Sequence, residues 1–130
     1  MTDVPAASKL FATWPTHIYF SGFEVGEAIL YPAASIEHDF PAGNPVAEAY
    51  RVYQKMPYDR PTWDLTTVLF DVRPDRGYFD LSPPGNVAVA SDGSTSFQPS
   101  AEGKRYFLSV NPMQAARVRE ACVWLASQPK

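Results

Sequence analysis

Paired cysteines, long apolar runs and clusters of basic residues are all missing from this 130-residue sequence. One cysteine allows no disulfide within the chain. No apolar run approaches the roughly 20 residues that span a bilayer, and the N-terminal residues lack the basic and apolar regions of a signal peptide. Lys and Arg are scattered and the net charge is -3, so nothing indicates a basic face for nucleic acid or anionic lipid. We therefore expect a soluble, cytoplasmic protein without a nucleic-acid or membrane partner.

Several motifs that define enzyme classes are missing as well. The sequence has no CxxC or HxxxH spacing for a metal, no GxSxG nucleophile turn and no glycine-rich phosphate loop. Cys122 stands in an apolar helical segment, which is typical of a buried thiol that packs as a small hydrophobe. The side chains left for chemistry are carboxylates, two histidines and aromatic rings.

The composition, 45% hydrophobic and 19% charged, is that of a packed globular protein. At this length we expect residues 1–130 to form a single domain. Asp3 and Pro5 open a first helix, and His17–Phe23 reads as a strand covered on both faces, as in a parallel sheet. The fold class is therefore α/β, with an open sheet and flanking helices.

The rest of the chain adds helices and a small antiparallel region. Residues 24–43 read mostly as loop, and Asn44 caps the helix that follows. Ser91–Ser94 is a hairpin connection between two short strands. Asn111 opens a helix that runs to about Ser127, so the expected hairpin region lies near the C-terminus, before the last helix.

A helix opening at Thr62 carries the most interesting carboxylate. Leu65, Val68, Leu69 and Val72 fall on one apolar stripe, and the helix ends before Pro74. Asp64 lies beside that stripe in the first turn, and Trp63 points nearly opposite. Because a carboxylate at a helix N-terminus is stabilised by the exposed amides, Asp64 reads either as a simple cap or as part of a site.

The other candidates for chemistry are weaker. His17 opens a strand, and His38 with Asp39 occupies a proline-flanked loop, which is typical of surface residues. Glu24 and Glu27 follow the buried strand, where ligands of open α/β sheets bind, although solvated loop charges are the simpler explanation for them.

Three segments resemble, in order and spacing, the C-terminal portion of the inosine-uridine-preferring nucleoside hydrolases. They are Asp3–Ala7, the strand end Ser21–Gly26, and the helix start Pro61–Asp64. The resemblance covers nearly all of this chain but only part of the family's domain, and it implies a partial nucleoside hydrolase-like open sheet. It also implies hydrolysis of an N-ribosidic bond in a nucleoside or related riboside.

The resemblance implies roles for individual residues. Family members bind Ca²⁺ through several aspartates, and the family's His-Asp pair corresponds to Trp63-Asp64. Asp64 therefore inherits a metal-ligand role, while Trp63 and Glu24 are expected to contact substrate. Trp63 replaces a histidine that assists the leaving base, and an indole cannot act as a general acid.

The family's N-terminal aspartate cluster and its ribose-binding Glu-x-Asn motif have no counterpart in this sequence. Calcium takes six to eight oxygen ligands, which one aspartate cannot supply. We therefore expect no catalytic residue in this chain, no bound calcium, and no activity of the chain alone. The strand His17–Phe23 should keep an exposed edge, and since family members are often dimers or tetramers, this edge would favour a homo-oligomer. The alternative is a non-catalytic binding or interaction module derived from the same fold.

Overall fold

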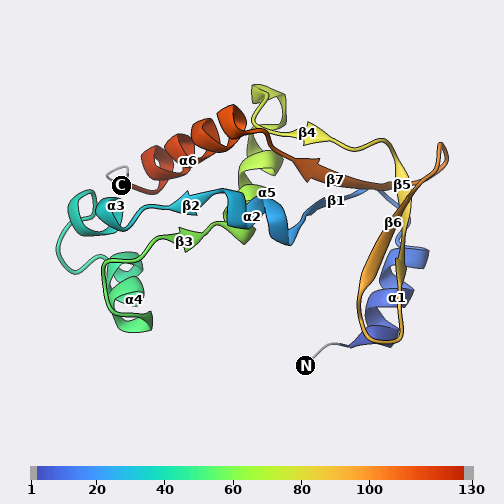
Figure 1. The fold of residues 1–130 in the computed structure, drawn as a ribbon, viewed down its shortest axis with the longest axis horizontal. Helices are drawn as coiled ribbons and strands as arrows, with labels where there is room; N and C mark the ends of the chain where they lie inside the picture. Colours follow the sequence, from blue (N-terminus) through green and yellow to red (C-terminus); the bar gives the residue numbers. More distant parts are fainter. Residues whose placement is uncertain (1–2, 128–130) are drawn as a thin grey trace. The chain divides into compact units, whose positions relative to one another are not determined.

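The computed structural model describes residues 3–127, which form an α/β chain of helices and short strands (Figure 1). It divides into two compact units. The first comprises the chain up to Phe20 together with Asp80–Ser109, and the second comprises Ser21–Phe79 together with the segment from Val110 onward. Within residues 3–127, no helix combines the length and the apolar character needed to cross a membrane.

The first unit is a mixed sheet with one helix, α1 (Val4–Thr13), packed against β5. The sheet order is β1-β7-β5-β6, and β4 pairs with β7. Three pairs are antiparallel: β4 with β7, β5 with β6, and β5 with β7. The strands are β1 (Ile18–Ser21), β4 (Asp80–Leu81), β5 (Gly85–Val89), β6 (Thr95–Pro99) and β7 (Arg105–Ser109).

Local signals correctly predicted the first helix cap and the hairpin turn of this unit. The Asp3 carboxylate accepts a hydrogen bond from the Ala6 amide at 3.0 Å and so caps α1. At the hairpin between β5 and β6, the Ser94 amide donates to the Asp92 carboxylate at 2.9 Å. Gly93 adopts a φ of 86°, which glycine reaches without strain. Each of these features depends only on residues close in sequence.

The strand expected at His17–Phe23 is shorter and less covered than predicted. β1 spans Ile18–Ser21, because Gly22 turns the chain and Phe23 already begins a helix. β1 lies at an edge of the sheet and is only partly buried, so the prediction of a strand covered on both faces is wrong. The prediction that this strand has an exposed edge is confirmed for the described residues.

The second unit is mainly helical. Its helices are α2 (Phe23–Ala28), α3 (Ala33–His38), α4 (Pro45–Tyr53), α5 (Trp63–Val72) and α6 (Pro112–Ser127), with a 3₁₀ turn, η1 (Pro74–Arg76). The short strands β2 (Leu30–Tyr31) and β3 (Arg60–Pro61) pair antiparallel. The core of this unit is formed by buried side chains of Val25, Ile29, Tyr31, Ile36, Ala47, Leu69, Val118 and Cys122.

Residues 24–43, predicted to be mostly loop, instead contain α2, β2 and α3. Contacts distant in sequence account for the difference. β2 exists because it pairs with β3, about thirty residues later in the chain. The Asp59 carboxylate accepts a hydrogen bond from the Ala33 amide at 2.8 Å, which satisfies the first turn of α3.

The caps expected at Asn44 and Asn111 are confirmed. The Asn44 side chain accepts from the Val46 amide at 2.9 Å at the start of α4. At the start of α6, the Asn111 side chain accepts from the Gln114 amide at 2.9 Å, and the Gln114 side chain accepts from the Asn111 amide at 2.8 Å. This reciprocal pair is a capping box.

α5 begins after Thr62 as predicted, but it buries a different face. Of the predicted apolar stripe only Leu69 is buried, while Leu65, Val68 and Val72 are 41%, 58% and 61% exposed. Thr66 is buried instead. Its hydroxyl lies 2.6 Å from the Ser21 hydroxyl and donates to the Trp63 carbonyl at 2.6 Å, so a polar side chain is accommodated in the interior.

Candidate functional site

The start of α5 is fixed to the end of α2 by the backbone and hydroxyl of Thr62. Its amide donates to the carbonyls of Gly26 and Ile29, both at 3.2 Å. Its hydroxyl donates to the Ile29 carbonyl at 2.8 Å, and the residue is buried. The side chains of Trp63 and Asp64 therefore leave the backbone from a rigid position.

Trp63 packs across α2. Its indole stacks on Phe23 with ring centroids 5.6 Å apart, and the indole N–H donates to the Phe23 carbonyl at 3.3 Å. Gly26 lies directly beneath the indole, where a Cβ atom would overlap Cδ1 of Trp63. The indole N–H is thus used for packing, and the ring is held between α2 and the start of α5.

Asp64 is exposed in the first turn of α5 and makes no hydrogen bond or ion pair with residues 3–127. Its carboxylate remains available to a ligand. Glu24 is also exposed, in the first turn of α2 next to Phe23. The sequence placed Glu24 in a loop, but it belongs to a helix.

Trp63 and Asp64 line a hollow of about 440 Å³ within the second unit, and Glu24 is not part of its lining. This volume is in the range of small-molecule sites. Most of the surface is aromatic or aliphatic, and its charged groups are Arg60 and Asp64. We call it the α5 hollow, and it is lined by Tyr31, Ile36, Phe40, Val46, Tyr50, Arg60, Pro61, Thr62, Trp63, Asp64, Leu65 and Ala126.

The sequence analysis missed Arg60 and the tyrosines around it. The Arg60 guanidinium carbon lies 4.1 Å from the centre of the Tyr53 ring. A hydrogen bond from Arg60, together with its charge, lowers the pKa of Tyr53. Tyr50 stacks on Tyr58 at 5.9 Å, and the Tyr58 hydroxyl donates to the Tyr50 carbonyl at 2.8 Å. The close succession of tyrosines before Arg60 was the available signal.

The residues present do not by themselves fit a calcium ion. Among residues 3–127, no three His, Cys, Asp or Glu side chains gather in a group that could hold a metal. Calcium requires six to eight oxygen ligands, and Asp64 is a single carboxylate in the α5 hollow. A calcium site at Asp64 would need ligands from elsewhere.

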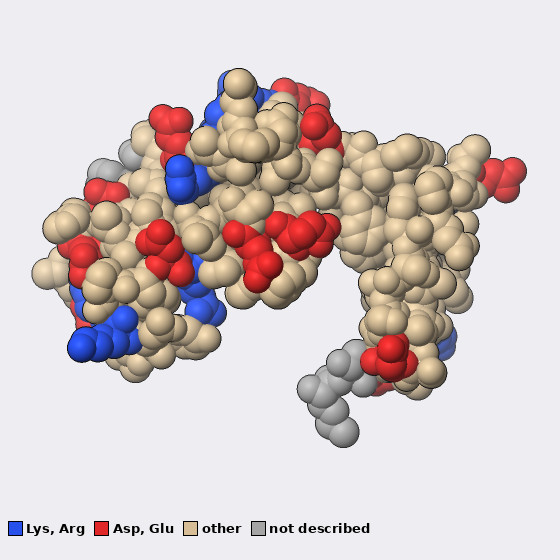
Figure 2. All heavy atoms as spheres, in the orientation of Figure 1, with Lys and Arg blue, Asp and Glu red and all other residues tan. Residues whose placement is uncertain are grey.

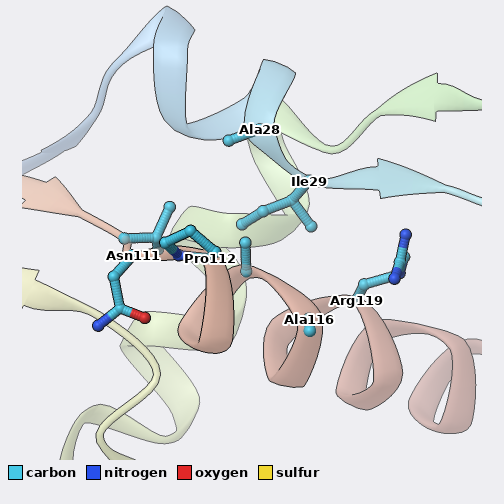
Figure 3. A pocket seen from close by; sticks show the side chains of 8 residues that line it. Ala28, Ile29, Asn111, Pro112, Ala116 and Arg119 are labelled. Carbon is cyan, nitrogen blue, oxygen red and sulfur yellow. The ribbon is translucent and has the colours of Figure 1, made fainter.

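A second hollow, of about 390 Å³, lies beside α6 in the same unit (Figure 3). Its lining includes Ile29 and Ala116, and the polar side chains of Asn111 and Arg119 lie at its two ends in Figure 3. Asn111 is already used in capping α6. This hollow therefore offers one exposed cation and little other chemistry.

The remaining candidates do not join the α5 hollow. His17 is exposed and lies just before β1. His38 is the last residue of α3 and Asp39 is its C-cap, so the His38-Asp39 pair ends a helix and does not belong to the loop that was expected. Cys122 is buried, as predicted, and burial raises the pKa of its thiol to about 11. On the face shown in Figure 2, basic side chains are dispersed among acidic ones.

Replacing Asp64 with asparagine is expected to change the free energy of unfolding by no more than about 1 kcal/mol, because only a helix-terminus charge is lost. A denaturant titration of the purified chain would measure the change. The exposed Asp71→Asn variant, near the end of the same helix, is the control. A loss of several kcal/mol would contradict the exposed, unpartnered position of Asp64.

Comparisons with known proteins give no further assignment: no protein-family model, no curated protein and no solved structure matches the chain.

Proposed function

We propose that this chain is the C-terminal portion of a nucleoside hydrolase-like protein, which cleaves N-ribosidic bonds in nucleosides or related ribosides. The observation that carries the proposal is the joint position of Trp63 and Asp64 in the aromatic α5 hollow. Flat rings of a base stack on aromatic side chains, and a carboxylate accepts hydrogen bonds from sugar hydroxyls or binds a cation. The hollow thus offers both kinds of contact that a riboside needs.

The roles proposed for individual residues follow from their surroundings. Trp63 and Tyr50 provide ring surface for the base, and Asp64 faces the ribose, either directly or as one ligand of a calcium ion completed by residues outside this chain. Trp63 cannot supply a proton to the leaving base, because its N–H donates to the Phe23 carbonyl and an indole is no general acid. Glu24, in the first turn of α2, does not line the hollow, so it is proposed to contact only a part of the substrate that extends beyond the hollow.

A non-catalytic binding module is the second candidate. It is favoured by the absence, among residues 3–127, of a side-chain group that could hold a metal ion. In that case the α5 hollow would bind a riboside or sugar without cleaving it. If the ligand is a partner protein and not a small molecule, it would bind to the same unit, and its binding would not require the Asp64 carboxylate.

Hydrolysis assays separate the two candidates. This chain alone is expected to release no base or ribose from inosine, uridine or 4-nitrophenyl riboside, with or without calcium. Joined to the protein sequence encoded upstream of Met1, it is expected to cleave these ribosides in the presence of calcium. Asp64→Asn should then lower kcat/KM at least about a hundredfold, as expected for loss of a group that contacts the reacting sugar.

Asp71→Asn is the matched control and should leave the rate unchanged. A stop codon upstream with no aspartate cluster, or full activity of the Asp64→Asn protein, would contradict the hydrolase proposal.

A further inference from the structure

The hollow beside α6, of about 390 Å³, has aliphatic walls. We call it the α6 hollow, and it is lined by Ala28, Ile29, Val110, Asn111, Pro112, Ala115, Ala116 and Arg119. All of these side chains except Asn111 and Arg119 are aliphatic, and Ile29 is only 1% exposed. The lining residues of α6 recur at i, i+3, i+4 and i+7 from Pro112, so they lie along one face of the helix. An apolar group in this hollow would therefore be removed from water along its length.

Arg119 places a positive charge at one end of the α6 hollow. Its side chain rises from α6 on the side of Ile29, with the guanidinium at the end of the hollow (Figure 3). The Arg119 side chain forms no hydrogen bond or ion pair with residues 3–127. Arg117, two positions earlier, instead donates to the carbonyls of Arg76 and Gly77. Because a guanidinium stays charged at physiological pH, the donors of Arg119 are available to an anion.

The opposite end of the α6 hollow carries no charge. The carboxamide of Asn111 turns away from Ile29 in Figure 3, and its oxygen accepts a hydrogen bond from the Gln114 amide. No acidic side chain lines the hollow. A ligand therefore meets one cation at one end and aliphatic side chains along the rest, which favours an anionic group attached to an apolar body. A carboxylate matches the planar guanidinium with two parallel hydrogen bonds.

We propose that the α6 hollow binds a small monocarboxylate with a hydrocarbon chain, its carboxylate on Arg119 and its chain along α6 towards Pro112. From Pro112 to Arg119 the helix rises by about 10 Å, so a medium-chain acid in extended form has a suitable length. Inorganic phosphate would pair with Arg119 but leave the aliphatic walls without contact. The inference uses neither Trp63 nor Asp64, and it is independent of riboside hydrolysis.

An NMR titration of the ¹⁵N-labelled chain with octanoate tests this inference, because it reports both the affinity and the location of binding. Octanoate is expected to shift the amide signals of Ala28, Ala115 and Ala116 saturably. It should bind about fivefold more tightly than octanol, which has the same chain length but no charge to pair with the exposed guanidinium. Hexanoate, which is two methylene groups shorter, should bind about fivefold more weakly than octanoate.

Three variants separate the charge from the apolar walls. Arg119→Gln should remove the preference for octanoate over octanol, whereas Ala116→Leu should weaken the binding of both ligands by filling the hollow. Arg117→Gln is the matched control, because it removes the same charge from another face of α6. It should leave both affinities unchanged.

Equal affinities of the wild-type chain for octanoate and octanol would overturn the inference, and this comparison requires no variant to fold. A preference for octanoate that persists in Arg119→Gln would overturn it too. So would the absence of saturable shifts along α6, or saturable shifts confined to the residues of the α5 hollow.

Discussion

Replacing Arg105 with alanine is expected to lower the free energy of unfolding of the first unit by about 3 kcal/mol or more. Arg105 is only 4% exposed, yet it forms no ion pair with a carboxylate among the described residues. Its guanidinium donates to the carbonyls of Phe11, Trp14 and Thr16 at distances from 2.7 to 3.1 Å. The Phe11 carbonyl belongs to the last turn of α1, and those of Trp14 and Thr16 come after the helix, so no intrahelical donor reaches them.

The alanine variant would leave several of these carbonyls without a donor beside the cavity of the lost side chain. Arg105→Lys should recover part of the loss, because an ammonium has three donors but cannot span the same positions. Urea titration followed by circular dichroism would measure the changes, with Lys9→Ala on the exposed side of α1 as the control. A change below 1 kcal/mol in Arg105→Ala would show that the guanidinium does not hold the end of α1.

Placing a methyl group at Gly26 is expected to destabilise the second unit by about 2 kcal/mol, within the range observed for overpacking. A Cβ atom at this position would meet the Trp63 side chain and lie 2.8 Å from its Cα, which belongs to the backbone of α5. The indole alone could rotate, but the backbone contact forces α2 and α5 apart. The same shift would disturb the hydrogen bonds from Thr62 to Gly26 and Ile29.

Gly26→Ala can be followed by denaturant titration and by near-ultraviolet circular dichroism, which reports on the stacked Phe23 and Trp63 rings. Glu27→Ala, an exposed substitution in the same helix, should change stability by no more than about 0.5 kcal/mol. Unchanged stability together with an unchanged aromatic signal in Gly26→Ala would contradict the close approach of the two helices.

The features that the sequence predicted correctly are those set by neighbouring residues. The caps at Asp3, Asn44 and Asn111 need only a side-chain acceptor and amides within three positions, so a short stretch of sequence contains all the information. The hairpin at Ser91–Ser94 is similar, because Asp92 and Gly93 determine its turn. The antiparallel region and the last helix were therefore predicted at the positions where the structure has them.

The errors arise where distant parts of the chain decide the outcome. β2 depends on pairing with β3, and α3 is capped by Asp59, so residues 24–43 looked like loop. The buried face of α5 could not be read from its apolar periodicity, because Thr66 is satisfied by Ser21, forty-five residues earlier.

The candidate site, too, could be predicted only in the part that depends on neighbouring residues. The helix start at Trp63 and Asp64 was evident from the sequence, whereas the hollow beside it is assembled from β2, α3, α4, β3 and α6. Arg60 was not predicted to belong to a site, because an isolated arginine in a sequence is most often a solvated charge. Its position over Tyr53 and its place in the hollow emerge only from the folded chain.

An NMR titration of the ¹⁵N-labelled chain with inosine would test most directly whether the α5 hollow binds a riboside. The chain contains three tryptophans, and the indole resonance of Trp63 can be assigned with a Trp63→Phe variant. We expect inosine to shift the Trp63 indole signal saturably and to leave that of Trp14, in the first unit, unchanged. No shift of Trp63 at millimolar inosine, or equal shifts of both signals, would contradict a riboside site at the start of α5.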